Sequence, residues 1–183
     1  DWYTTIIIAS LTIIVIAKLL NPNRFVEFMK FVGNSNYLRI HFKDHSFFDP
    51  FDVFLFINFC INAVLTGIIA YRFYESNVNI NFVYFIKLVA ILGIGFLLKI
   101  LLELAVGAIF EIEKISHSYV FQQISTLNFL GVLLLPLNAL LVFSFPNQFS
   151  LLVITLVISG LIILIGLFKS IKSYQKVLIN NFF

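Results

Sequence analysis

The sequence predicts an all-α, polytopic membrane helix bundle with about five transmembrane helices and additional interfacial amphipathic helices. Hydrophobic residues make up 61% of the 183 residues and charged residues only 11%, whereas soluble domains are about 45–50% apolar and about 25% charged. Polar groups could not cover the apolar surface of such a chain in water, so lipid must be the solvent for much of it. The Lys and Arg residues also gather on alternate connections between the apolar stretches. We therefore expect one transmembrane domain over residues 1–183.

Five apolar stretches reach the length of about 20 residues that a helix needs to cross a bilayer. Breaking segments such as Asn21-Pro22-Asn23 and Pro146-Asn147 separate them. Pro136 falls inside the fourth stretch, where it removes a backbone donor and is expected to bend the helix. The third stretch is long enough to tilt or to project beyond the bilayer. The expected spans are residues 2–20, 52–74, 82–110, 116–145 and 150–168.

The distribution of basic residues predicts the orientation of these spans. Lys and Arg gather after the first span, between the third and fourth spans, and in the C-terminal tail. The connection over residues 145–150 has none, and the turn at Glu75 is flanked only by Arg72 and Lys87. With five spans, the three basic regions share one face, which the positive-inside rule makes cytoplasmic. The start of the chain is then outside and residue 183 is inside.

Two short segments have the pattern of amphipathic helices that lie in the membrane interface. In residues 169–179, lysines share one side of a helix and apolar residues another, so that the lysines would contact anionic headgroups. In residues 24–32, apolar side chains recur at i, i+3, i+4 and i+7. We favour membrane anchoring over docking of a partner for both. In residues 24–32, the apolar face consists of Phe25, Phe28, Met29 and Val32. The residues expected to face away are Arg24, Glu27 and Lys30.

Polar side chains inside the spans form stripes on several helices. Such amides and hydroxyls can hydrogen-bond across a helix interface for about 0.6 to 2 kcal/mol each, and this structural role is the one we favour over a hydrophilic pathway. A five-helix bundle has limited interior space. At least one stripe is therefore expected to meet a helix from another chain or from a C-terminal part beyond residue 183, with the stripe on the second span as the first candidate. The helix-interface candidates are Asn58, Asn62, Thr66, Asn128 and Asn138.

Lys99 and Glu103 are the ion-pair candidates, four residues apart on one face of the third span. An ionisable residue inside the membrane is costly and is by default a hypothesis for a functional site. Counting inward from Phe82 places both residues near the cytoplasmic boundary. There Lys99 can extend to the headgroups and Glu103 can pair with it, so we favour a structural pair over proton or ion handling.

No residue pattern predicts a catalytic site, a cofactor or a metal centre. Gly93-Ile94-Gly95 lacks the third glycine and the preceding strand of a dinucleotide site. The net charge of +3 is too small to suggest a nucleic acid partner. Imidazole and carboxylate groups that suit zinc or iron do occur in one loop, but we favour a solvated interfacial loop there. These residues are His41, Asp44, His45 and Asp49.

Three sequence elements resemble one known family. The resemblance is to an inner-membrane family of the Bacteroidota that is catalogued as a domain of unknown function and is often encoded beside uroporphyrinogen-III synthase. It implies a helical protein of the bacterial inner (cytoplasmic) membrane, tied to the envelope or secretion machinery, with no established activity. Members usually carry one further apolar helix, so we expect the chain to be part of a longer protein. The elements are Asp1-Trp2-Tyr3-Thr4, Phe48-Asp49-Pro50-Phe51, and the run from Asn128 to Pro136 and Asn138.

These observations predict a non-enzymatic integral membrane subunit or scaffold of a larger inner-membrane complex, in envelope biogenesis or protein secretion. Its expected partners are the lipid bilayer and other membrane subunits. A small transporter or ion-conducting subunit that uses Lys99 and Glu103 is the alternative. A membrane-embedded enzyme is a third reading, for which only the loop from His41 to Asp52 offers suitable groups.

Overall fold

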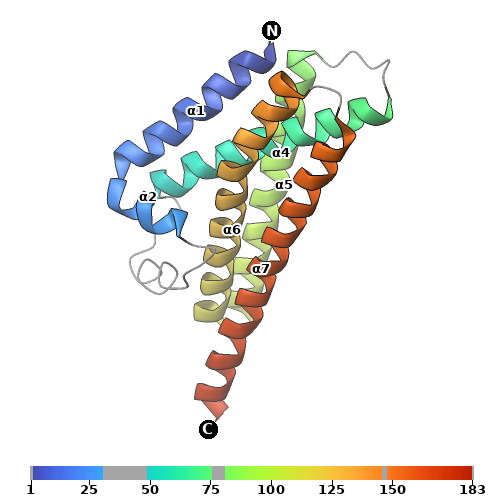
Figure 1. Ribbon diagram of the computed structural model, residues 1–183. Helices are drawn as coiled ribbons and strands as arrows, with labels where there is room; N and C mark the ends of the chain where they lie inside the picture. The colour runs from blue at the N-terminus through green and yellow to red at the C-terminus, as the bar shows by residue number, and fades with distance from the viewer. Residues whose placement is uncertain (1, 31–48, 76–80, 146–147, 183) are drawn as a thin grey trace.

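The computed structural model describes residues 2–30, 49–75, 81–145 and 148–182, with the side chains of Lys114 and of residues 171–182 left out. Every regular element in this part of the chain is a helix, which confirms the predicted all-α fold (Figure 1). The elements are α1 (Trp2–Leu20), α2 (Pro22–Met29), α4 (Pro50–Tyr74), α5 (Phe82–Ile109), α6 (Glu113–Ala139), the π-helical turn η1 (Leu140–Ser144) and α7 (Phe149–Phe182).

Five of these helices, namely α1, α4, α5, α6 with η1, and α7, are long and apolar enough to cross a membrane. They indicate a membrane protein whose exposed apolar side chains contact lipid. The helices alternate in direction, so the start and the end of the chain lie at opposite ends of the bundle (Figure 1). This arrangement brings the ends of α1, α5 and α7 to the same side as the start of α4.

Polar side chains fix where three of the helices begin. Asn21 accepts a hydrogen bond from the backbone N–H of Arg24 at 3.3 Å, and Asn81 accepts one from the backbone of Tyr84 at 2.8 Å. Asp49 accepts one from the N–H of Phe51 at 3.0 Å. Pro22 and Pro50 occupy the first helical positions, where a missing N–H has no cost.

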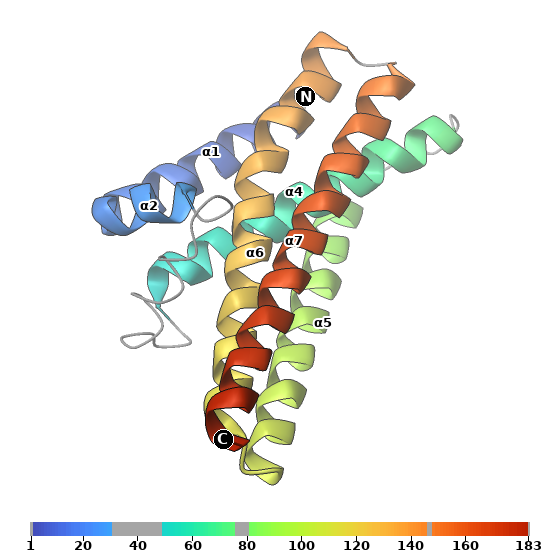
Figure 2. The ribbon, with the colours of Figure 1, turned by 60° about the horizontal axis from the view of Figure 1, so that its bottom comes forward.

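The centre of the bundle is the contact between α4 and α6, which run in the same general direction and cross at a marked angle (Figures 1 and 2). Gly131 permits their close approach, because a Cβ atom added there would lie 2.5 Å from the Cα atom of Phe59. Helix α1 packs on α4, whereas α5 and α7 flank α6. Half of the residues in the apolar stretches of α4 and α6 are buried, against 6% for α5.

The two segments expected to be amphipathic helices in the interface differ from the prediction. In α2, Arg24 is only 5% exposed and shares the buried face with Phe28, whereas Met29 is 45% exposed. The expectation that Arg24 faces away was wrong, because two aspartates at the start of α4 bind its guanidinium. Val32 lies outside the described residues. Residues 169–179 form no separate helix but continue α7.

The fourth span passes through Pro136 without a break and ends in the π-helical turn η1. Proline has no N–H to donate to the preceding turn, which loosens the backbone ladder at that point. The N–H of Phe145 then donates to the carbonyl of Leu140 at 2.9 Å, five residues earlier, and closes the turn. Such π-helical turns are rare and usually single.

Candidate functional site

The main polar feature of the bundle is a network of hydroxyl and amide side chains where α1, α4 and α6 meet. Ser10 comes from α1, Asn58, Asn62 and Thr66 come from α4, and Asn138 comes from α6. The helical repeat puts the three α4 residues on one face, since residues four apart lie one above the other. All five side chains are buried. We call these five residues the central network.

One half of the central network joins α1 to α4. The Nδ2 of Asn62 donates to the Oγ of Ser10 at 2.6 Å, and the Ser10 hydroxyl donates in turn to the Oδ1 of Asn58. Asn62 also donates to the backbone carbonyl of Asn58 at 2.9 Å. The Ser10 hydroxyl of α1 is therefore both an acceptor and a donor in the interior of the bundle.

The other half joins α4 to α6. The hydroxyl of Thr66 donates to the Oδ1 of Asn138 at 2.8 Å. The Nδ2 of Asn138 donates to the backbone carbonyl of Asn62 at 3.0 Å and to its Oδ1 at 3.3 Å. Hence the side chain of Asn138 is satisfied entirely by α4, and three helices share one hydrogen-bonded unit.

These contacts overturn the expectation that the stripe of Asn58, Asn62 and Thr66 meets a helix from another chain or from a further C-terminal part. Each of the three side chains is buried inside this chain. The interior of the bundle can hold the α4 stripe because the stripe of α6 and the Ser10 hydroxyl of α1 approach it from two sides. A single chain therefore supplies both partners of each cross-helix hydrogen bond in the central network.

A second polar group, which we call the arginine clamp, ties α2 to the first turn of α4. The guanidinium of Arg24 pairs with Asp49 through one nitrogen and with Asp52 through the other, the latter at 2.5 Å. It also lies 4.6 Å from the centre of the Phe51 ring. Asn128 of α6 donates to the backbone carbonyl of Asp52 at 3.3 Å. A planar guanidinium can hold two carboxylates at once, which a lysine cannot do with the same geometry.

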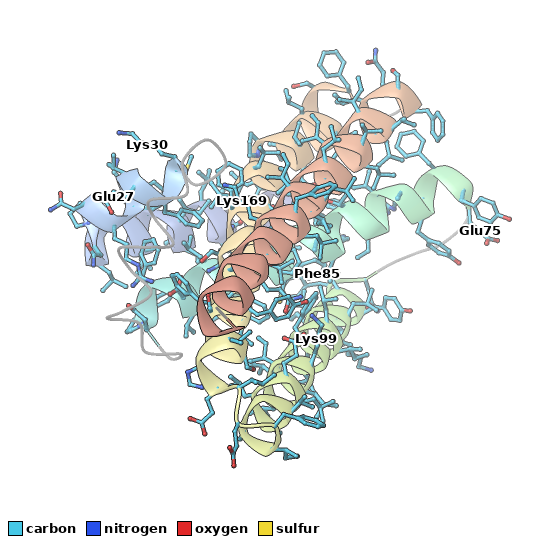
Figure 3. The ribbon with its side chains drawn as sticks, turned by 90° about the horizontal axis from the view of Figure 1, so that it is seen from below. Glu27, Lys30, Glu75, Phe85, Lys99 and Lys169 are labelled. Atoms are coloured by element: carbon cyan, nitrogen blue, oxygen red, sulfur yellow. The ribbon has the colours of Figure 1, made fainter. Side chains whose placement is uncertain are left out.

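Lys99 and Glu103 form an ion pair on α5, with the Lys99 Nζ 3.1 Å from a carboxylate oxygen of Glu103. Their side chains are 43% and 23% exposed. The hydroxyl of Ser116 on α6 donates to the backbone carbonyl of Glu103 at 2.7 Å and anchors this part of α5. Figure 3 shows Lys99 on α5. Among the described residues, no hydrogen bond links this pair to the central network.

A further contact holds α7 against α6. The side chain of Gln122 donates to the backbone carbonyl of Gly166 at 3.2 Å. A Cβ atom on Gly166 would lie 2.5 Å from the methyl group of Thr126, so only glycine allows the two helices to approach this closely. Small residues serve the same purpose in other membrane helix pairs.

A comparison with protein-family models matches residues 3–183 to a family described as "Domain of unknown function (DUF4271)". The chain belongs to this family. Searches of curated proteins and of solved structures found no match. Membership in the DUF4271 family agrees with the resemblance to a domain of unknown function. The bacterial phylum and the neighbouring gene stay predictions.

In this DUF4271 chain, the chemistry of the central network is that of hydrogen bonding. Its groups are amides and hydroxyls, which neither gain nor lose a proton near neutral pH. The ionisable groups of the arginine clamp already bind one another. The described residues include no group of three or more His, Cys, Asp or Glu side chains that could hold a metal ion. Asp49 caps α4, and His41, Asp44 and His45 lie outside the described residues.

The sequence reasoning missed Ser10, Arg24 and Asp52 as members of polar clusters. The sequence groups Arg24 with the basic residues that follow the first span, and it places Asp52 at the start of the second span and at the end of the loop from His41. One available signal was the position of Asp52, an acidic residue in the first turn of an otherwise apolar helix. Ser10 had a similar signal, since it is a small polar residue in the middle of an apolar span.

Proposed function

We propose that this protein is a non-enzymatic integral membrane subunit that acts as a scaffold in a larger complex of the bacterial inner membrane, in envelope biogenesis or protein secretion. The observation that carries the proposal is the position of α5. This helix is apolar apart from Lys87, Lys99 and Glu103, yet only 6% of the residues in its apolar stretch are buried in the bundle. A helix with so large an exposed apolar face is suited to contact another membrane protein.

The use of the polar side chains supports a scaffold over a conducting or catalytic role. In the central network and the arginine clamp, the interior polar groups bind helices to one another. They fix the arrangement of α1, α2, α4 and α6, and α5 packs on α4 and α6 with its outer face exposed. A fixed surface of this kind reduces the entropy that is lost when a partner binds.

The ion pair on α5 also fits a partner surface. The Lys99 side chain is 43% exposed on α5, so its ammonium is within reach of a polar group on an approaching partner helix. The alternative, an ion-conducting subunit, would place the same pair in a water-filled path.

Site-specific photo-crosslinking in living cells tests the scaffold proposal. A photoreactive amino acid at Leu98 on α5 is compared with one at Ile8 on α1, because both side chains are 58% exposed. We expect Leu98 to give a discrete protein adduct that co-purifies in mild detergent, and Ile8 to give lipid adducts only. Lipid adducts at both positions would contradict the proposal. Ion flux in proteoliposomes that depends on Lys99 would favour the conducting alternative.

We further propose that residue 183 faces the cytoplasm. The basic residues of the connection after α1 support this orientation through the positive-inside rule. In a chain with Cys60 replaced by serine, an impermeant thiol reagent added outside should label Glu75→Cys but not Lys30→Cys. Both positions are exposed ends of described helices (Figure 3). The opposite labelling would reverse the proposed orientation.

A further inference from the structure

An apolar groove lies between α1, α4 and α5, toward the end of the bundle where the chain starts. Its volume is about 230 Å³, and its accessible lining is apolar. Thr5 and Ala9 form the α1 wall, Ile61 forms the floor from α4, and Phe85 and Val89 belong to the α5 wall. Figure 3 labels Phe85. The groove lies within the first turns of α1 and α5, which places it in one half of the bilayer.

A cation and a row of aromatic rings lie beside this groove. The guanidinium of Arg72 is 5.2 Å from the centre of the Tyr3 ring. Tyr3 stacks on Trp2 with ring centres 3.8 Å apart, and Trp2 lies 5.7 Å from Phe85, which lines the groove. The Arg72 side chain is exposed and forms no ion pair with another described residue. Tyr3 also has a buried hydroxyl without a hydrogen-bond partner among the described residues.

We propose that this groove binds one acyl chain of a membrane phospholipid, whose phosphate contacts Arg72. The ligand must combine a narrow apolar body with an anionic group at one end, and a phospholipid has both. A helix is about 10–12 Å across with its side chains and does not fit a groove of this volume, whereas an acyl chain is a single file of methylene groups. Trp2 and Tyr3 are the residue types that mark the depth of lipid headgroups.

The phosphate contact follows from the charge of the groove's surroundings. Arg72 is a cation at the end of α4, and the described groove residues contribute no carboxylate. A basic residue near a surface of anionic phospholipids strengthens binding to that surface about fivefold. The inference does not depend on the proposed scaffold function, because the groove faces lipid whether or not the rest of α5 meets a partner.

Native mass spectrometry of the purified full chain, with bound phospholipids counted after mild delipidation, tests the proposal. Ala9→Trp fills the groove, and its control Ala90→Trp adds the same bulk at an exposed position of α5 outside it. Arg72→Gln removes the cation, and its control Lys18→Gln removes an exposed cation at the other end of α1. We expect one retained phospholipid in the unchanged chain and in both controls. Ala9→Trp should lose it, and Arg72→Gln should retain it about fivefold less well.

A phospholipid with a photoreactive acyl chain gives a second measurement that does not require a variant to fold. Adducts should concentrate on the segments of α1 from Thr5 to Ala9 and of α5 from Phe82 to Val89. Equal lipid retention in Ala9→Trp and Ala90→Trp, or adducts spread evenly over the exposed helices, would overturn the site. A protein crosslinked at the groove in place of lipid would also overturn it.

Discussion

The hydroxyl of Thr66 offers a sharp test of whether the central network stabilises the bundle. Thr66→Val keeps the shape of the side chain and removes only the hydroxyl. That hydroxyl donates to Asn138 on α6 at 2.8 Å and lies 2.9 Å from the carbonyl of Asn62 on its own helix. The change therefore removes a cross-helix hydrogen bond and leaves the Asn138 oxygen without its donor.

The magnitude follows from measurements on polar contacts in membrane helices. A cross-helix side-chain hydrogen bond in a bilayer contributes about 0.6 kcal/mol on average and about 1.7 kcal/mol at most. Because Thr66 and Asn138 are both buried, water cannot replace the lost bond. We expect Thr66→Val to lower the free energy of unfolding by about 1 kcal/mol.

Thr12→Val is the matched control. Its hydroxyl donates only to the carbonyl of Ile8 on the same helix, at an exposed position. This bond joins two residues of the same helix. Its loss should therefore leave the free energy of unfolding nearly unchanged. The free energies of unfolding are measured in bicelles by trapping the unfolded chain, with helix content followed in parallel.

A double-mutant cycle isolates the contact itself. Thr66→Val and Asn138→Leu are made singly and together, and the coupling energy is expected to be about 1 kcal/mol. Residues that do not interact give additive effects within about 0.3–0.5 kcal/mol. Additive effects here, with Thr66→Val as harmless as Thr12→Val, would refute the role assigned to the central network.

Three further predictions concern other contacts. Arg24→Met takes the guanidinium from a buried carboxylate and should lower the free energy of unfolding by about 3–5 kcal/mol in the same assay. An unchanged free energy would show that the clamp does not stabilise the bundle. Gly131→Ala should lower it by about 1–3 kcal/mol, because the new methyl group meets the backbone of α4, whereas Gly95→Ala meets nothing within 4 Å and should be harmless. Replacing both Lys99 and Glu103 with leucine should leave the thermal unfolding midpoint nearly unchanged, whereas Glu103→Leu alone should lower it. An equal loss in the single and double variants would exclude a structural pair.

The fold class could be predicted from the sequence because lipid imposes a simple rule. Every backbone polar group in the hydrocarbon region must be satisfied within its own segment, so long apolar stretches become helices. The polar residues of α4 and α6 could be named for a similar reason, since an amide in an apolar span needs a partner. Asn62 and Asn138 stood out on these grounds alone.

What could not be predicted was which residues meet. Helical periodicity gives the face of a helix but not its neighbour. It therefore marks Asn138 as a helix-interface residue without naming its partner, and the stripe of Asn62 was expected to meet a helix from another chain or from a further C-terminal part. Arg24 was misplaced for a related reason. Periodicity puts it opposite the apolar stripe of its short helix, but the pairing with Asp52 depends on the packing of α2 against α4. In both cases, the packing of one helix against another determines which residues meet.

The central network also constrains the order in which this protein can assemble during synthesis. Asn62 and Ser10 belong to the first two spans, so their hydrogen bond can form as soon as α4 enters the membrane. Asn138 follows Asn62 by 76 residues, which at about 5–20 residues per second takes about 4–15 s to synthesise. During that interval the amide of Asn62 lacks the helix that later covers it. The packing of the first two spans is therefore completed only seconds later, when α6 covers Asn62.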